Sequence, residues 1–169
     1  MKTRDLTLGA IFVAIISIGS KLAIPLDMLG MRFTLQWLFV LLCALVMEKK
    51  SILVLTVYLL IGLIGLPVFA RGGGIWYIMK PTFGFLLGFL FSVIVMSYLN
   101  SNELKKVIAG LIVYYLVGFV YYVFMMNVIL HNSIGLWLSI VNCFTTIIPD
   151  FMLCLIAEFI YKRIRHVLK

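Results

Sequence analysis

Long apolar runs separated by short polar breaks are the feature that most constrains this chain, and they extend from about Thr7 to Tyr161. Hydrophobic residues make up 64% and charged residues 12% of the 169 residues, whereas soluble domains carry about 25% charged residues. Charges this sparse cannot cover a water-facing surface, and a membrane-spanning helix needs about 20 predominantly apolar residues. The sequence therefore predicts an all-α integral membrane protein and excludes an ordinary soluble enzyme.

The polar breaks predict six transmembrane helices in a single domain, residues 1–169. The first five are expected at 7–24, 33–47, 52–66, 82–99 and 107–130. The last is less regular, because the stretch from Pro149 to Tyr161 would give only about 20 Å of helix against a bilayer core of about 30 Å. It is expected either to begin near Ile140 and kink at Pro149, or to be a short helix topped by a buried loop.

Basic residues predict the orientation in the membrane. With six spans, one side holds Lys2, Arg4, Lys49, Lys50, Lys105, Lys106, Lys162, Arg163, Arg165 and Lys169. The other side holds only Lys21, Arg32, Arg71 and Lys80. Because cytoplasmic flanks are enriched in Lys and Arg, both termini are predicted to lie on the cytoplasmic side of the cell membrane. Topology thereby explains the net charge of +8, and no nucleic-acid partner is expected.

The chain lacks the short motifs of several enzyme classes. It contains no phosphate-binding GxxxxGK[ST], no zinc-binding HExxH and no GxSxG nucleophile motif. Cys43, Cys143 and Cys154 lie in apolar runs without metal-ligand spacing. We expect no catalytic residue, no metal and no cofactor, and the chain by itself should not hydrolyse ATP.

The segment between the third and fourth predicted spans carries the strongest functional signal. Each of the glycines at 72–74 disfavours a helix by about 1 kcal/mol, so the segment is expected to leave helical geometry and to bring backbone amides close to a ligand. Arg71 and Lys80 bracket it, and Trp76 and Tyr77 add flat apolar area. These features suit a small amphiphilic anion, but an outer loop with interfacial aromatics and snorkelling cations fits the composition equally well.

Two glycine-containing stretches are distinctive, Gly-Leu-Pro-Val-Phe-Ala-Arg-Gly-Gly-Gly at 65–74 and Pro-Thr-Phe-Gly-Phe-Leu-Leu-Gly-Phe at 81–89. They resemble the BioY family, the biotin-type substrate-binding (S) components of energy-coupling factor (ECF) transporters, and the likeness follows span order over the whole chain. The resemblance implies a six-helix S-component bundle with an outward-facing pocket. It also implies three partners, a transmembrane coupling (T) subunit and two cytoplasmic ATPase subunits.

The resemblance further implies that the chain binds a small vitamin carboxylate, with biotin as the first choice, and delivers it through the coupling module. Arg71 and Lys80 are the candidate partners of the carboxylate. Aromatic side chains of the same region are expected to bury the apolar body of the ligand. The expected substrate-binding residues are Arg71, Gly72, Gly73, Gly74, Trp76, Tyr77, Lys80, Thr82, Phe83, Gln36, Tyr121 and Asp150.

Small residues with a spacing of four predict close helix contacts. Ala10 and Ala14 are similar to the AxxxA motif that S components present to the coupling subunit, and we expect Gly9 to widen the same flat patch. Gly84 and Gly88 have the same spacing, and there we expect packing inside the bundle.

Asp150 is a carboxylate deep in the last span, where charged residues are functional candidates, and it is expected to line or brace the pocket. Glu158 and Lys162 are expected to form an ion pair between successive helical turns. Related proteins usually carry Pro-Gly-Asp and then Lys in this helix, whereas this chain has Pro149 directly before Asp150, and Cys154 further on. Lipoate or a biotin precursor therefore stays an alternative ligand. An intramembrane enzyme or a scaffold without a transport role is the alternative of another class.

Overall fold

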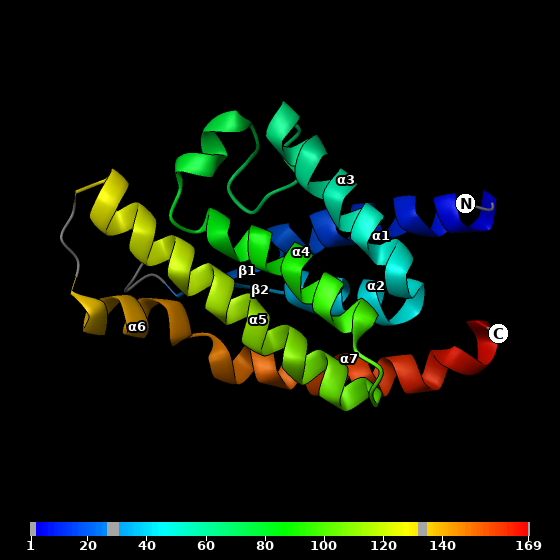
Figure 1. Cartoon of the computed structure of the whole chain (residues 1–169). Helices are drawn as coiled ribbons and strands as arrows, with labels where there is room; N and C mark the ends of the chain where they lie inside the picture. The colour runs from blue at the N-terminus through cyan, green and yellow to red at the C-terminus, as the bar shows by residue number, and fades with distance from the viewer. Residues whose placement is uncertain (1–2, 27–30, 132–134, 169) are drawn as a thin grey trace.

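The computed structural model describes residues 3–26, 31–131 and 135–168, and in this part the chain is almost entirely helical (Figure 1). The α-helices are α1 (Thr3–Lys21), α2 (Gln36–Met47), α3 (Ser51–Ile64), α4 (Phe83–Tyr98), α5 (Glu103–Phe124), α6 (Leu136–Phe144) and α7 (Ile147–Leu168). Two 3₁₀ turns, Glu48–Lys50 and Ile75–Met79, and a π-helical turn, Met125–Ile129, complete the helical segments, and β1 (Ala23–Leu26) pairs antiparallel with β2 (Met31–Thr34).

Three helical segments of the described residues are long and apolar enough to cross a membrane: Thr3–Lys21, Glu103–Ile129 and Leu136–His166. They coincide with the first, fifth and last predicted spans. The other three predicted spans coincide with α2, α3 and α4, which have 12, 14 and 16 residues. At 1.5 Å per residue these helices reach only about 18 to 24 Å, less than a bilayer core of about 30 Å.

The β1–β2 hairpin is a departure from the expected all-α class. The first span was predicted to continue to Ile24, but α1 ends at Lys21 and the chain then pairs Ala23 with Thr34 across the hairpin. Proline at position 25 has no N–H for a helical hydrogen bond. Strand pairing satisfies the backbone of this segment instead.

The last predicted span consists of two consecutive helices with a break between them. Helix α6 begins at Leu136, and the turn at Thr145 and Thr146 leads into α7. Pro149 lies in the first turn of α7, where its missing N–H has no intrahelical partner to lose. The expectation of an early start with an interruption at Pro149 was therefore correct to within one helical turn, because a proline disturbs the turn that precedes it. The interruption is a break at Thr145 and Thr146 and not a kink in a continuous helix.

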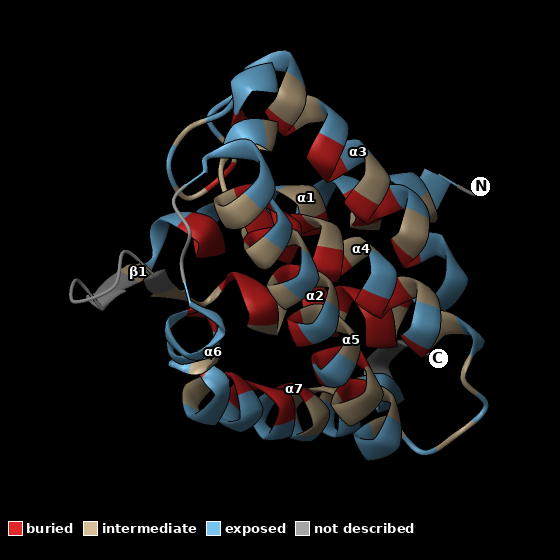
Figure 2. Ribbon diagram, turned by 60° about the vertical axis from the view of Figure 1, so that its left-hand side comes forward, coloured by how far each residue is buried: buried red, intermediate tan, exposed pale blue. Residues whose placement is uncertain are grey.

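Close packing of α4 against α5 depends on glycines that face the opposite helix. A Cβ atom on Gly84 would lie 2.3 Å from Cβ of Tyr121, and one on Gly88 would lie 2.8 Å from the carbonyl oxygen of Tyr114. Both distances are shorter than van der Waals contact, so the backbones approach as closely as they do only because these side chains are missing. The predicted packing role of Gly84 and Gly88 is confirmed. Figure 2 shows the buried residues gathered on the inward faces of the helices.

Both termini lie at one end of the bundle, and ion pairs connect the helices there (Figure 1). Lys50 Nζ lies 2.7 Å from Asp5 Oδ2, and Arg165 Nη1 lies 3.3 Å from Glu103 Oε1. The predicted pair of Glu158 and Lys162 is also confirmed, at 2.7 Å. The hairpin, the segment 65–82 and the start of α6 lie at the opposite end (Figure 1). The side predicted to be rich in basic residues is therefore one physical end of the bundle.

The α4–α5 contact predicts that Gly84→Ala is destabilising, because the added methyl group would meet a rigid Cβ atom of α5. Overpacking of this kind costs about 1–3 kcal/mol. Thermal unfolding of the purified protein in detergent should show a lower apparent Tm than that of the parent. Gly135→Ala is the matched control, because a Cβ there would meet no atom within 4 Å. Equal Tm values for the two variants would contradict the close contact.

Candidate functional site

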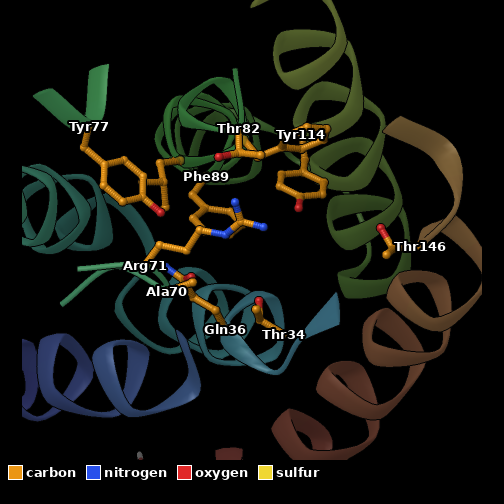
Figure 3. A pocket seen from close by; sticks show the side chains of 11 residues that line it. Thr34, Gln36, Ala70, Arg71, Tyr77, Thr82, Phe89, Tyr114 and Thr146 are labelled. Carbon is orange, nitrogen blue, oxygen red and sulfur yellow. The ribbon is translucent and has the colours of Figure 1, made fainter. Parts of the chain in front are cut away.

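A pocket opens at the end of the bundle opposite the termini, and elements distant in sequence contribute to it (Figure 3). Strand β2, helices α2, α4 and α5, the segment between α3 and α4, and the α6–α7 turn each supply side chains. The lining residues are Thr34, Gln36, Ala70, Arg71, Tyr77, Thr82, Phe85, Leu86, Phe89, Tyr114 and Thr146.

The glycine-rich loop owes its shape to backbone conformations that side chains disfavour. Gly72 and Gly74 have φ of 107° and 108°, in the region that glycine tolerates best. A Cβ on Gly73 would lie 2.1 Å from the carbonyl oxygen of Leu66. The amide of Gly72 donates to the Phe69 carbonyl at 3.1 Å, and the amide of Gly74 donates to the Gly62 carbonyl at 2.7 Å. These two amides bond within the protein, and the glycines fold the loop back on itself.

Phe69 anchors the loop in the bundle. Its side chain is fully buried and contacts the rings of Tyr58 and Tyr77 with centroids 5.5 Å and 4.8 Å away. Gly62 on α3 leaves the space for it, because a Cβ there would lie 2.1 Å from Cζ of Phe69. The apolar side chain thus fixes one end of the segment from which Arg71 extends.

Polar side chains from α1 and α3 hold two consecutive carbonyl groups of the same loop. Lys21 Nζ donates to the Phe69 carbonyl at 2.7 Å, and Ser20 Oγ donates to the Val68 carbonyl at 2.8 Å. The Tyr58 hydroxyl also donates to the Val68 carbonyl, at 3.0 Å. Irregular backbone at membrane depth needs such partners. Lys21, one of the cations on the sparsely charged side, therefore has a structural role in the loop.

Four of the predicted substrate-binding residues line the pocket: Gln36, Arg71, Tyr77 and Thr82. Figure 3 shows the Arg71 guanidinium among the lining side chains. Gln36 donates its Nε2 hydrogen to the Tyr58 hydroxyl at 2.8 Å, and because that hydroxyl donates to Val68, the orientation of the Gln36 amide is fixed. Helix α2 and the loop are thereby connected directly behind the pocket.

The other predicted residues lie around the pocket without lining it. Lys80 Nζ lies 4.3 Å from the centroid of the Tyr77 ring, within the range of a cation–π contact. Phe83 is buried between Tyr77 and Tyr121, and the Tyr121 hydroxyl donates to the carbonyl of Ile78. Trp76 is 81% exposed, and Gly72, Gly73 and Gly74 shape the loop.

An aromatic stack of Tyr114, Phe89 and Trp37 forms one wall of the pocket. Tyr114 and Phe89 stack with centroids 5.2 Å apart and an interplanar angle of 4°. Trp37 stacks on Tyr114 from behind at 4.6 Å and is buried. Aromatics within apolar spans are ordinary packing residues, so no pattern in the sequence distinguishes Phe89 and Tyr114 as pocket residues.

Asp150 lies behind the pocket wall, where it is 4% exposed. Its Oδ2 accepts a hydrogen bond from the Tyr115 hydroxyl at 2.6 Å, and that hydroxyl lies 3.0 Å from Oγ1 of the pocket residue Thr146. Cys154, one turn further along α7, is buried, and its thiol contacts the Val107 carbonyl at 3.9 Å.

The charge on the pocket lining comes from one side chain. Among the eleven lining residues of the described chain, Arg71 is the one with a charged side chain, and the others contribute neutral hydroxyl, amide and apolar groups. A guanidinium recognises a carboxylate through two parallel hydrogen bonds, and the aromatic wall can cover an apolar body. The pocket therefore suits a small monoanion with a largely apolar remainder.

Ala10 and Ala14 lie on the outer face of α1, both exposed, beside the exposed Leu6 and Ile11. Gly9 does not belong to this face, and the expectation that it widens the patch was wrong. It is buried, and a Cβ there would lie 3.2 Å from Val54 of α3.

The fold defines the class of protein. The chain superimposes on a crystal structure of the S-component for biotin from an ECF-type ABC transporter with a TM-score of 0.84, at 23% sequence identity, over 98% of this chain and 92% of that chain. Apart from the β1–β2 hairpin, it is a helical membrane protein with the S-component fold.

The sequence comparison gives the family, because the BioY family model matches residues 1–169. The chain belongs to the BioY family. It is 35% identical to the probable biotin transporter BioY of Lysinibacillus sphaericus, over 96% of this chain and 89% of that protein. It is 37% identical to the biotin transporter BioY of Thermotoga maritima, over 76% of this chain and 78% of that protein.

The contact of Lys21 with the loop predicts that Lys21→Met loosens the glycine-rich segment, because the Phe69 carbonyl loses a charged donor. Hydrogen bonds to charged groups contribute about 1.5–3 kcal/mol, so amide exchange at Gly72 and Gly74 should accelerate about tenfold or more when followed by mass spectrometry. Lys21→Arg should restore part of the protection. Lys105→Met, a change on the exposed surface of α5, is the control. Unchanged exchange in Lys21→Met would contradict the anchoring role.

Proposed function

We propose that this chain is the biotin-binding S component of an ECF-type importer. The observation that carries the proposal is a pocket with one cation, Arg71, and an aromatic wall at one end of a bundle with the S-component fold. Membership of the BioY family, whose compared members are named biotin transporters, supports biotin as the ligand. Biotin is a monocarboxylate with an apolar chain and a compact polar ring system, which agrees with the pocket.

In this proposal Arg71 binds the carboxylate of biotin, while Phe85, Phe89 and Tyr114 cover apolar parts of the ligand. Tyr77 and Thr82 add hydroxyl groups from the loop region. Lys80 acts through its contact with the Tyr77 ring. The three glycines act by shaping the loop.

The proposed topology has six spans and both termini in the cytoplasm. The end of the bundle that holds the termini carries the basic residues predicted for the cytoplasmic face, and the pocket then opens to the outside. The short helices α2, α3 and α4 cross by combining with the loop segments at their ends. The chain has no ATPase motif, so uptake depends on a coupling subunit and two ATPase subunits. The exposed Ala10 and Ala14 form the proposed contact with the coupling subunit.

Ligand titration of the purified protein tests the proposal. Biotin should bind more tightly than lipoate by about tenfold or more, because a site with hydrogen-bonding groups discriminates against an analogue that lacks the matching ones. Gly73→Val should lose most of this affinity, because its side chain would collide with the Leu66 carbonyl. If lipoate or a biotin precursor binds more tightly than biotin, that molecule is the ligand, and the assignment of biotin is wrong. Absence of binding of all three, or hydrolytic turnover, would support the scaffold or enzyme alternatives.

The coupling face has its own test. A variant that combines Ala10→Trp and Ala14→Trp should bind biotin as the parent does, because both side chains are exposed on the side of α1 that faces away from the bundle. Biotin uptake by cells that express the complete transporter should fall strongly, since bulky side chains prevent close helix approach. Ile112→Trp, on the exposed face of α5, is the control and should transport normally. If the double variant binds biotin more weakly than the parent, Ala10 and Ala14 stabilise the pocket. Their assignment to the contact with the coupling subunit is then wrong.

A further inference from the structure

The turn between α6 and α7 brings Thr146 to the pocket and, on its other side, to a buried polar pair. Thr146 Oγ1 lies 3.0 Å from the Tyr115 hydroxyl oxygen, and that hydroxyl donates to Asp150 Oδ2 at 2.6 Å. Thr146, Tyr115 and Asp150 are only 7%, 3% and 4% exposed. The backbone amide of Asp150 also donates to the Thr146 carbonyl at 2.9 Å, which connects the α6–α7 turn to the first turn of α7.

The hydroxyl hydrogens of Tyr115 and Thr146 have one possible arrangement in this hydrogen-bond network. A carboxylate can only accept hydrogen bonds, and a tyrosine hydroxyl has a single hydrogen. Because that hydrogen of Tyr115 goes to Asp150, Tyr115 must accept in its contact with Thr146. The hydroxyl hydrogen of Thr146 is therefore already used, and its oxygen has only lone pairs left for the pocket.

We propose that Thr146 is a specificity-determining residue that accepts a hydrogen bond from an N–H group of the ligand, with Tyr115 and Asp150 as positioning residues. This inference rests on the proposed function and deepens it, because it identifies the second chemical group of the ligand. The pocket then selects a monocarboxylate whose other end carries an N–H donor, such as the cyclic urea of biotin. The dithiolane ring of lipoate has no such donor.

The positions of Arg71 and Thr146 in the pocket agree with binding of two separate groups of the ligand. Figure 3 shows Arg71 and Thr146 entering from different elements, the glycine-rich loop and the α6–α7 turn, with Tyr114 between them. An elongated ligand can therefore place its carboxylate at one group and its ring at the other. Donation to Tyr115 uses the hydroxyl hydrogen of Thr146 but leaves its oxygen able to accept a further hydrogen bond.

The test compares Thr146→Val with Thr146→Ser by calorimetric titration of biotin. Valine keeps the shape of threonine but removes the acceptor, so the Kd for biotin should rise about tenfold or more. Serine keeps the hydroxyl group and should bind biotin within about threefold of the parent. Thr145→Val is the matched control, because the Thr145 side chain is exposed and donates to the carbonyl of Val141. Thr146→Ser and Thr145→Val should retain the apparent Tm of the parent, whereas Thr146→Val also loses the buried hydrogen bond to Tyr115 and should unfold at a slightly lower temperature.

Displacement of labelled biotin by lipoate gives a second measurement. The preference for biotin over lipoate should fall about tenfold in Thr146→Val. Tyr115→Phe should reduce the same preference, because Thr146 then regains a free hydrogen and no longer acts as an acceptor only. This second variant leaves the Thr146 side chain intact, so it tests the orientation separately from the loss of the acceptor.

The outcomes separate the two proposals. If the parent protein does not bind biotin, both the proposed function and this inference are overturned. If the parent binds biotin but valine and serine at position 146 behave alike, only the inference is overturned. An equal loss of biotin and lipoate affinity in Thr146→Val would assign the residue to packing and overturn the inference in the same way.

Discussion

The hydrogen bonds that hold the carbonyl groups of Val68 and Phe69 are the interaction on which the pocket depends. An irregular segment at the end of a membrane bundle must satisfy its own backbone, and here Ser20, Lys21 and Tyr58 supply the donors. The buried Phe69 ring fixes the same point from the apolar side. Arg71 follows two residues later and lines the pocket. The placement of a charged group thus derives from neutral backbone groups and one buried ring, which order the loop before any ligand arrives.

The opposite wall of the pocket depends on the close packing of two helices, α4 and α5. Gly84 and Gly88 bring α4 against α5, which places Phe89 beside Tyr114 and leaves Trp37 to support the stack. Behind this wall Asp150 orients a hydroxyl network. The site therefore combines an irregular glycine-rich loop with a closely packed helix pair. The loop supplies the charge, while the helices supply the apolar surface and the fixed hydrogen-bond directions.

Sequence reasoning predicted what depends on local pattern. Apolar runs located all of the long helices, and the glycines at 72–74 identified the loop from which Arg71 and Tyr77 reach the pocket. Tyr114 and Thr146 could not be found in this way, because they become pocket residues only through contacts between distant helices. The hairpin was missed because its apolar residues continue the pattern of the first span. Asp150 was recognised as a buried carboxylate, whereas its partner Tyr115 comes from another helix and has no signature in the sequence.

The central claim is that the loop places Arg71 to bind the carboxylate of the ligand. It is tested most directly by measuring the affinities of biotin and of biotinol, the neutral alcohol analogue, for the parent protein and for Arg71→Gln. A charge-assisted contact is about twice as strong as a neutral one, so the parent should prefer biotin by about tenfold or more. In Arg71→Gln the preference should shrink to about twofold or less, because glutamine carries no charge. The same preference in both proteins would contradict the account.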